Sequence, residues 1–395
     1  MNHFKKQQIQ NIADFNPREQ LAKGALAKSV PMAMLKEFQR QITGYEIKAF
    51  NGGAKFRNGD TLLAKITPCL ENGKTAFVDI LDDGEVAFGS TEFIVLRAKN
   101  ETNPEFLYYF AISPDFRKRA IECMEGTSGR QRVNENTLKT LELPIPETQT
   151  QQSIAAILSA LDKKIALNKQ INARLEEMAK TLYDYWFVQF DFPDANGKPY
   201  KSSGGEMVFD ETLKREIPKG WEVKSLGDWA EIRKGTLITE KTANTNGDIK
   251  VISAGVDFSY YHDVANRPKN TITISASGAN AGFVNFWREP IFACDCTTIT
   301  NSVIGRTLYI LNFLKIVQDF IYQQARGSAQ PHVYPKDIEG LKIIVPPDSL
   351  LKNFSEFVDN WNLKIANNEK QNHQLTQLRD FLLPMLMNGQ VSVAE

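Results

Sequence analysis

The sequence lacks the short motifs that mark most nucleotide-dependent and metal-dependent enzymes. It has no GxxxxGK[ST] phosphate loop, no GxGxxG after a strand, and no Asn/Asp-Pro-Pro-aromatic segment of the kind that amino-methyltransferases use. Histidine is scarce, with four residues at positions 3, 262, 332 and 373, none at metal-ligand spacing from a cysteine. We therefore expect no catalytic centre, no metal and no cofactor.

Cysteine and long hydrophobic runs are also scarce. The four cysteines, Cys69, Cys123, Cys294 and Cys296, do not form a disulfide framework and indicate a reducing compartment. No segment approaches the ~20 apolar residues that a membrane helix needs, and no apolar stretch of the signal-peptide kind follows Met1. The expectation is a soluble cytoplasmic protein that does not enter a membrane.

An excess of charge of either sign is missing as well. Lys and Arg total 47, and Asp and Glu also total 47, so the formal net charge is +0. Any affinity for nucleic acid must therefore come from local patches, or from partner chains that supply positive charge.

Two weaker patterns have simpler interpretations. Cys294-Asp295-Cys296 is too isolated for a zinc site and fits a buried strand end. Pro193-Asp194 followed by Glu222-Val223-Lys224 spells a loose nuclease pattern, but such a match arises easily by chance and Asp194 falls in a turn-rich segment.

The chain nearly repeats itself at a fixed offset. Residues 127–185 align without a gap on residues 327–385, with identities such as Leu141 on Leu341 and Asn168 on Asn368. So long a period indicates two copies of one large unit rather than a solenoid of small ones, and 395 residues suit two or three domains. Two similar units can present two similar surfaces to a repetitive target such as DNA.

Each unit ends in a predicted long helix, the first over about 148–189 and without Gly or Pro. Apolar residues recur at alternating steps of four and three, which is a heptad seam with two Asn in its middle. The seam positions are Ile154, Leu158, Leu161, Ile165, Asn168, Asn172, Leu175, Ala179, Leu182 and Trp186 in the first helix, and Phe354, Val358, Trp361, Ile365, Asn368, Asn372, Leu375, Arg379, Leu382 and Leu386 in the second.

The matched seams predict that the two helices pair with each other, antiparallel. The expected facing pairs are Asn168 with Asn372, Asn172 with Asn368, Ile165 with Leu375, Leu175 with Ile365, Leu182 with Val358, and Ile154 near Leu386. Buried Asn at seam positions weakens packing but fixes the register. The alternative is that each helix packs only on its own domain.

A polar loop precedes the last strand of each unit at the same place in the repeat. Gly and Ser let the backbone approach a phosphate, and Arg, Gln, Asn and His side chains read base edges or hold phosphates. Recurrence of the loop favours DNA binding over a merely solvated surface loop. The candidate residues are Thr127, Ser128, Arg130, Gln131, Arg132 and Asn134 in the first unit, and Arg326, Ser328, Gln330, His332 and Tyr334 in the second.

Strand ends supply a second and weaker set of candidates, because Thr and Lys are common at strand ends on any surface. These are Lys65, Thr67 and Lys74 in the first unit, and Ser275, Ser277 and Asn280 in the second.

Longer segments resemble a known family, the specificity subunit of type I restriction–modification systems. The resemblance covers nearly the whole chain, and its strongest parts are Gln151–Leu158 with Leu161–Ile165, Phe190–Pro193 with Gly197–Gly205, and Ile217–Val223 with Leu226–Asp228. Two departures stand out. The opening of the second unit has only Ile9–Asp14 as an N-terminal match, and the second helix lacks the Gln151-Gln152 pair.

The resemblance implies a division of the chain. It gives a first target-recognition domain at 1–147, a central conserved-region helix at 148–190, a linker at 191–216, a second target-recognition domain at 217–347, and a C-terminal conserved-region helix at 348–390. The expected fold class is α+β, with two mixed α/β domains related by pseudo-twofold symmetry and joined by two long helices in an antiparallel coiled coil.

The resemblance also implies a function and partners. Each domain would read one half of a split double-stranded DNA target, and the helices would set the spacer. Two methyltransferase (modification) subunits would bind around the helices, and motor-nuclease (restriction) subunits would complete a complex to which this chain contributes no catalysis. Two alternatives stay open: a coiled-coil scaffold without nucleic acid, or a nuclease or methyltransferase with an unrecognised active site.

Overall fold

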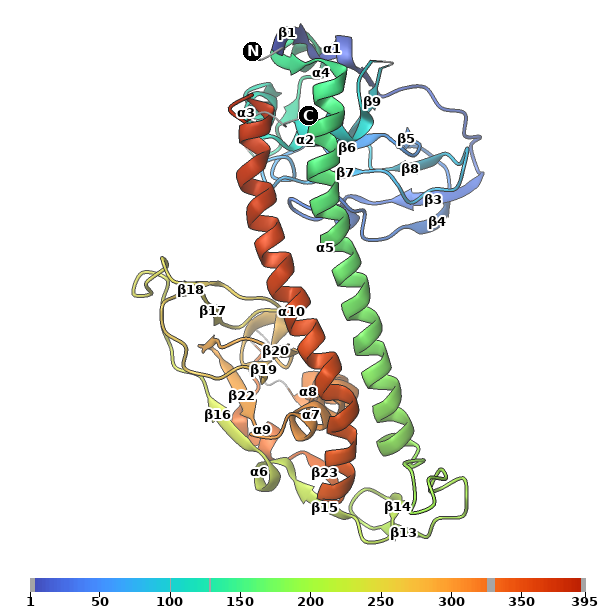
Figure 1. Cartoon of the computed structure of the whole chain (residues 1–395), viewed down its shortest axis with the longest axis vertical. Helices are drawn as coiled ribbons and strands as arrows, with labels where there is room; N and C mark the ends of the chain where they lie inside the picture. The colour runs from blue at the N-terminus through green and yellow to red at the C-terminus, as the bar shows by residue number, and fades with distance from the viewer. Residues whose placement is uncertain (1–3, 100, 128, 325–330, 392–395) are drawn as a thin grey trace. The chain divides into compact units, whose positions relative to one another are not determined.

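The computed structural model describes residues 4–99, 101–127, 129–324 and 331–391. The chain forms two compact units: unit 1 comprises residues 1–167 and 371–395, and unit 2 comprises 168–370. Each contains one mixed α/β module and a segment from each of two long helices (Figure 1). No helix in the described part of the chain is both long enough and apolar enough to cross a membrane.

Unit 1 begins with a mixed module and passes into the first long helix. Its elements are β1 (Phe4–Gln8), α1 (Ile9–Ile12), β2 (Ala13–Phe15), β3 (Leu26–Val30), a 3-10 turn (Met32–Met34), β4 (Glu46–Ala49), β5 (Ala54–Phe56), β6 (Thr61–Ala64), β7 (Thr75–Phe77), β8 (Ala87–Gly89), β9 (Phe93–Ala98), α2 (Pro104–Ile112), α3 (Pro114–Glu122), β10 (Met124–Glu125), β11 (Arg132–Val133), α4 (Glu135–Thr140), β12 (Glu142–Pro146) and the start of α5 (Thr148–Tyr183).

Unit 2 continues from α5 and repeats the same kinds of element. They are a π-helical turn (Asp184–Val188), β13 (Met207–Asp210), β14 (Arg215–Pro218), β15 (Glu222–Ser225), α6 (Leu226–Trp229), β16 (Glu231–Lys234), β17 (Ile249–Ile252), β18 (Tyr260–His262), β19 (Thr271–Ser275), a 3-10 turn (Gly278–Asn280), β20 (Val284–Trp287), β21 (Phe292–Ala293), β22 (Cys296–Thr300), α7 (Ile304–Ile316), α8 (Gln318–Gln324), α9 (Pro335–Glu339), β23 (Lys342–Val345) and α10 (Asp348–Met387), whose last part belongs to unit 1.

The two modules share one topology, which confirms the predicted duplication. Unit 1 has a sheet of order β2-β9-β6-β7, a sheet of order β4-β3-β8-β5 and a pair β1-β12. Unit 2 has the corresponding sheet β16-β22-β19-β20, the sheet β18-β17-β21 and the pair β15-β23. Even the entry to the first short helix matches, because Ile9 N–H donates to Leu141 C=O (3.1 Å) and Leu226 N–H donates to Leu341 C=O (2.8 Å). The segment Ile9–Asp14 is thus the structural counterpart of the opening of the second unit.

Local sequence explains the helices that cover the unit 1 sheet. Asn103 and Ser113 each accept a hydrogen bond from a first-turn N–H, and each is followed by proline at the first helical position. The helical segment from Pro104 to Glu122 is therefore divided at Pro114 into α2 and α3. Most of α2 is buried, from Phe106 to Ile112, because it lies in the main apolar cluster of unit 1.

The segment 191–216 is more ordered than a linker needs to be. It contains β13 and the first residues of β14, which pair antiparallel. Phe192 packs between Tyr200 (4.7 Å between ring centroids) and Trp221 (5.1 Å). These aromatic contacts join the segment to the apolar core of unit 2.

The helix segments within each unit run antiparallel, as predicted. In unit 1, Asp162 of α5 contacts Arg379 of α10, whereas Ile165, further along α5, contacts Asn372. In unit 2, Asn172 bonds Asn368, and Trp186 lies against Phe354 with 6.1 Å between ring centroids. Each segment also packs on its own module, since Ile154, Leu158 and Leu386 belong to the same apolar cluster as α2.

Candidate nucleic-acid interface

In unit 1 the structure brings together two of the predicted segments, the end of β6 and the loop before the last strand. Thr67 N–H donates to Gln131 C=O (3.0 Å), and Val133 N–H donates to Lys65 C=O (2.9 Å). Ile66 and Arg132 form a bridge between these bonds. We call Lys65–Thr67 with Gln131–Val133 the first platform.

Unit 2 builds the same arrangement from its own residues. Gly278 N–H donates to Pro331 C=O (3.1 Å), and Val333 N–H donates to Ala276 C=O (2.9 Å). Ser277 and His332 form the bridge. We call Ala276–Gly278 with Pro331–Val333 the second platform. Because the backbone pairing is the same and the side chains differ, the two platforms can hold a similar ligand backbone while presenting different side chains to it.

Arg132 is the most exposed cation of the first platform that has a defined partner. Its guanidinium donates to both carboxylate oxygens of Glu92, from Nε (2.9 and 3.1 Å) and from Nη2 (2.7 Å), and 51% of its side chain is exposed. The bonds from Arg132 hold the pKa of Glu92 below its ordinary value. Arg132 is therefore oriented by a carboxylate and can reach a ligand. Arg130 is exposed in the adjacent turn, where its N–H donates to Thr127 C=O (3.0 Å).

Other predicted residues of unit 1 have structural roles. Asn134 caps α4, where its Oδ1 accepts from the N–H groups of Asn136 (3.0 Å) and Thr137 (3.2 Å), and its amide donates to Glu125 (2.8 Å). Thr67 is 9% exposed, and its hydroxyl accepts from Gln131 N–H (3.1 Å). Lys65 lies 3.6 Å from Glu135.

Lys74 and Thr127 lie at the edges of this region. Lys74 precedes β7 and is half-buried, and its N–H donates to Cys69 C=O (3.0 Å). Thr127 is exposed in the turn that contains Arg130. Ser128, Arg326, Ser328 and Gln330 lie outside the described residues.

In unit 2 the predicted residues divide into surface and interior. Ser277 donates to Asp295 (2.5 Å), and His332 stacks on Tyr334 with 6.1 Å between ring centroids. Tyr334 is 53% exposed and Asn280 is exposed on the 3-10 turn. Ser275 is 3% exposed, so its hydroxyl cannot reach a ligand without movement of the strand.

Two carboxylates that the sequence did not single out organise the platforms. Lys65 N–H donates to Glu92 C=O (3.0 Å), and Ala276 N–H donates to Asp295 C=O (3.3 Å), so Glu92 and Asp295 occupy corresponding places. Each immediately precedes a central strand, β9 or β22. Neither residue lies in 127–185 or 327–385, the two segments that align without a gap. Matching Glu92 with Asp295 from the sequence would therefore require an alignment of strands that allows insertions between them.

A cleft of about 740 Å³ adjoins the first platform at Lys65. It is lined by Asn16, Pro17, Arg18, Glu19, Gln20, Gly53, Ala54, Lys55, Lys65, Thr91, Phe93 and Val95. Behind it, Arg97 binds Glu19 (2.6 Å) and the buried Asp60 (2.7 Å), which ties the 16–20 loop to the sheet. Strand β5 forms one wall, and no described strand of unit 2 pairs at the corresponding place. Its three cations, Arg18, Lys55 and Lys65, suit an anionic ligand.

The cysteine pair fits a strand end. Cys294 is 2% exposed and Cys296, the first residue of β22, is fully buried. Burial raises the pKa of the Cys296 thiol to about 12. Across residues 4–99, 101–127, 129–324 and 331–391, no cluster of three or more His, Cys, Asp or Glu could hold a metal ion.

The seam asparagines fix the helix register within each unit. In unit 2, Asn368 donates its amide to Asn172 Oδ1 (2.8 Å), which confirms that predicted pair. In unit 1, the amide of Asn372 lies 3.4 Å from Ile165 C=O. Asn168 is buried, and its predicted pairing with Asn372 stays a prediction.

The chain contains two copies of one α+β module. Each module carries one platform and packs on antiparallel helix segments, and this arrangement defines a duplicated recognition protein. The chain belongs to the family described as the type I restriction modification DNA specificity domain, which matches at residues 8–177 and again at 218–377.

Relatives and a solved structure agree with this assignment. The chain is 29% identical over 312 residues to the type I restriction enzyme MjaIX specificity subunit of Methanocaldococcus jannaschii, covering 74% of this chain and 70% of that protein. It is 26% identical over 428 aligned positions to the HindI specificity subunit of Haemophilus influenzae, covering 87% and 90%. The crystal structure of the S subunit of a type I restriction-modification system from M. genitalium has the same fold, with a TM-score of 0.61 at 18% identity over 98% of this chain and 96% of that one.

Proposed function

We propose that this chain is the non-catalytic DNA-recognition subunit of a type I restriction–modification complex in the cytoplasm. Each module reads one half of a split double-stranded target, and the helix pair sets the spacer. The division at 1–147, 148–190, 191–216, 217–347 and 348–390 belongs to this proposal. The observation that carries it is the pair of platforms, which share backbone hydrogen bonds but present different side chains.

The side chains of the platforms fit a reader of base edges better than a merely electrostatic binder. Arg132 has the forked guanidinium that binds guanine O6 and N7, while His332 occupies the corresponding bridge position in unit 2. The cleft beside Lys65 adds cations that can position phosphates. With 47 basic and 47 acidic residues, the chain alone should bind DNA weakly, and the complex must supply further positive charge.

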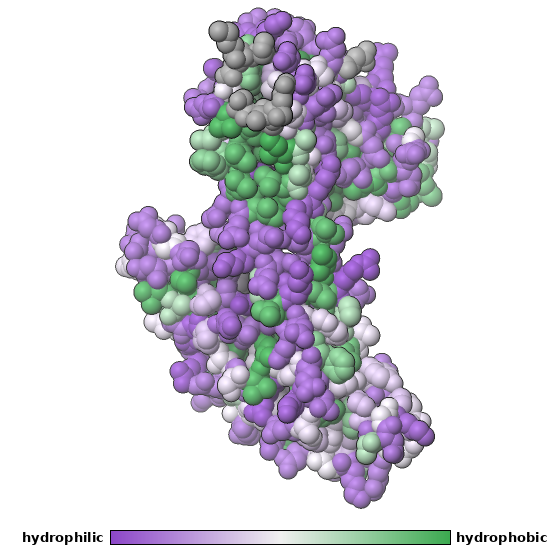
Figure 2. Space-filling view, in the orientation of Figure 1, coloured by the Kyte–Doolittle hydropathy of each residue, from purple (hydrophilic) through white to green (hydrophobic). Residues whose placement is uncertain are grey.

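Exposed apolar side chains on α10 support the proposed subunit partners. Figure 2 shows a contiguous apolar area over the C-terminal part of α10 in unit 1, where Leu378 is 45% and Phe381 is 60% exposed. In unit 2, Phe357 and Leu363 of the same helix are 51% and 59% exposed. Exposed apolar groups on a helix that already has a partner indicate further protein contacts. Two modification subunits would bind here, and restriction subunits would join them.

The spacer function can be tested with an insertion in the helix. One extra helical turn after Asn168 should move one platform by ~5.4 Å, which is more than one base-pair step. Mapping methylated sites made by the complex with its modification subunits should show a changed spacer between unchanged half-sites. Changed bases within an unchanged spacer would contradict the proposal.

The platform assignment can be tested by crossing two substitutions. Arg132→Ala should cost about 1–3 kcal/mol of discrimination in the first half-site only, and His332→Ala should relax the second half-site only. Arg132→Lys keeps the charge but loses the fork, so it should resemble the alanine variant in specificity. A uniform loss of affinity with both half-sites still strict would mean phosphate contact alone. Methyl transfer or cleavage by the purified single chain would contradict the non-catalytic assignment.

A further inference from the structure

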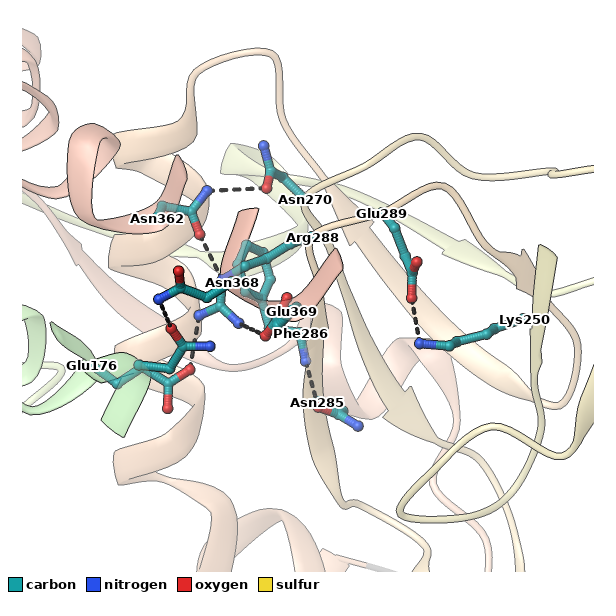
Figure 3. Close-up of polar contacts among 11 residues, drawn as sticks. Glu176, Lys250, Asn270, Asn285, Phe286, Arg288, Glu289, Asn362, Asn368 and Glu369 are labelled. Carbon is teal, nitrogen blue, oxygen red and sulfur yellow. Dashed lines mark hydrogen bonds and ion pairs between the residues drawn. The ribbon is translucent and has the colours of Figure 1, made fainter. Parts of the chain in front are cut away.

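One arginine, Arg288, joins the module of unit 2 to both helix segments (Figure 3). Arg288 directly follows β20, and 10% of its side chain is exposed. Its Nη2 donates to Glu176 of α5 (2.8 Å), and its Nη1 donates to Glu369 of α10 (2.9 Å). Its Nε donates to Asn362 of α10 (2.9 Å). The planar fork therefore uses all three nitrogens, and each bond goes to a different side chain.

A second contact reinforces the same junction. The amide of Asn362 donates to Asn270 Oδ1 (3.1 Å), and Asn270 immediately precedes β19. The guanidinium of Arg288 also lies over the Phe286 ring, 5.1 Å from its centroid. Asn368 lies close by (Figure 3), and its hydrogen bond to Asn172 fixes the register of the two helix segments. The junction thus connects the end of one hairpin to the place where the helix register is set.

The hairpin leads directly to the second platform. Strands β19 and β20 pair antiparallel, with Thr271 opposite Trp287, so Asn270 and Arg288 lie at the same end. At the other end, β19 finishes at Ser275 and passes into Ala276–Gly278 of the second platform. Five strand residues span roughly 17 Å. A small rotation at the Arg288 end therefore displaces the platform at the far end.

The charges at the junction make the arginine necessary for this geometry. Glu176 and Glu369 both bond its guanidinium, and without it two carboxylates would face each other. Lysine has one ammonium and cannot span three separated acceptors as the guanidinium does.

Unit 1 has no arginine at the corresponding place. Thr61 pairs with Phe77 as Ile272 pairs with Phe286, so the counterpart of Arg288, two residues further on, is Asp79. Asp79 carries the opposite charge, and its carboxylate accepts a hydrogen bond from Arg40 (3.2 Å). The contact made by Arg288 is therefore a property of the second module rather than of the repeat.

We infer that Arg288 is a positioning residue that fixes the orientation of the second platform on α5 and α10, and thereby makes the second half-site strict. This inference rests on the proposed function. Arg288 touches no platform residue itself and acts through β19 and β20.

Two measurements separate the orientation of the second platform from the recognition of DNA by the complex. Nitroxide labels at exposed Lys234 of β16 and Lys364 of α10, in a Cys69→Ser background, report the distance between module and helix within unit 2. Arg288→Ala should broaden this distance distribution. In the complex with modification subunits, it should reduce discrimination in the second half-site by about tenfold or more, with the first half-site unchanged. Arg288→Lys, which keeps the charge, should fold and still broaden the distribution.

The matched control is Lys250→Ala, which removes an ion pair with Glu289 in the same region (2.6 Å; Figure 3) without touching the helices. It should leave the distance and both half-sites unchanged. A narrow distribution and a strict second half-site in Arg288→Ala, or in Arg288→Lys if the alanine variant does not fold, would overturn the inference. Absence of sequence-specific binding by the wild-type complex would instead overturn the proposed function, and the label distances would still decide the role of Arg288.

Discussion

The two units share their backbone pairing but place the arginine that joins module to helices on different elements. In unit 1, Asp162 of α5 accepts hydrogen bonds from Tyr109 of the module (2.7 Å) and from Arg379 of α10 (2.8 Å). In unit 2 the arginine comes from the module, and the residue matching Asp162 in the repeat is Asn362. Tyr309, which matches Tyr109, bonds Ile344 C=O instead (2.6 Å). A duplicated fold can therefore keep its hydrogen-bonded framework while its buried charges are redistributed.

The two junctions also differ in solvent exposure. The side chains of Asp162 and Arg379 are 7% and 8% exposed. Burial lowers the pKa of Arg379, but its attractions and hydrogen bonds to Asp162 and Asp380 together outweigh burial, and the net pKa is raised. Around Arg288, the partners Glu176 and Glu369 are 49% and 47% exposed, so water screens that junction. We expect unit 1 to be more sensitive than unit 2 to loss of one charge.

The largest expected effect is at Asp162. Asp162→Ala would leave the Arg379 cation buried without that partner and would remove the acceptor of the Tyr109 hydroxyl, at a cost of about 3–5 kcal/mol. Hydrogen exchange of α2 amides would measure the loss within unit 1. Asp162→Asn introduces the residue that unit 2 has at the matching position, Asn362. It keeps a hydrogen-bond acceptor, so its cost in stability should be clearly smaller than that of Asp162→Ala. Equal losses for the two variants would mean that the charge of Asp162 is not what stabilises the junction.

A smaller effect is expected at matched apolar positions on the helices. Leu158 and Val358 match in the repeat and are 0% and 1% exposed. Leu158→Ala should cost about 3 kcal/mol and Val358→Ala about 2 kcal/mol, because the leucine loses one more carbon and leaves a larger cavity. Hydrogen exchange of amides in α2 and α7 would measure the stability losses of the two variants in their own units. A larger loss from Val358→Ala would show that unit 2 relaxes less well around a cavity.

The sequence anticipated the features that depend on local pattern or on the repeat. Heptad spacing predicted the helix pairing, and the offset of 200 residues placed the two loops at corresponding positions. The loop pattern predicts Asn134 as a DNA contact, but an asparagine just before a helix is also an N-cap signal, and the structure shows Asn134 capping α4. Glu92, Asp295 and Arg288 could not be singled out, because their partners are brought near only by strand pairing and have no fixed spacing in the chain.

The seam asparagines should show a still smaller and non-additive effect. Asn172→Leu alone leaves the amide of Asn368 without its acceptor and should cost about 1–2 kcal/mol. The double variant with Asn368→Leu should recover that stability or exceed it, but should lose the single register. Unfolding measurements on the two single variants and the double variant complete the cycle, and methylated-site mapping would report mixed spacers. A unique spacer in the double variant would mean that apolar packing alone sets the register.

The smallest effect is a pH dependence at Glu369, which is faced by Arg288 after β20, Glu176 of α5 and Glu289 of the same module. Although the side chain is half-exposed, partial loss of hydration at the carboxyl raises its pKa above the ordinary value of 4.5, and attraction to Arg288 only partly offsets this. A carboxyl with a raised folded-state pKa contributes stability that is fully present below its unfolded pKa and is lost as pH rises through the folded pKa. The stability of wild type relative to Glu369→Gln should therefore fall as pH increases from about 4 towards neutrality. Urea unfolding of both proteins across that range would measure the slope, and a rising difference would show that the ion pair with Arg288 outweighs burial at this junction.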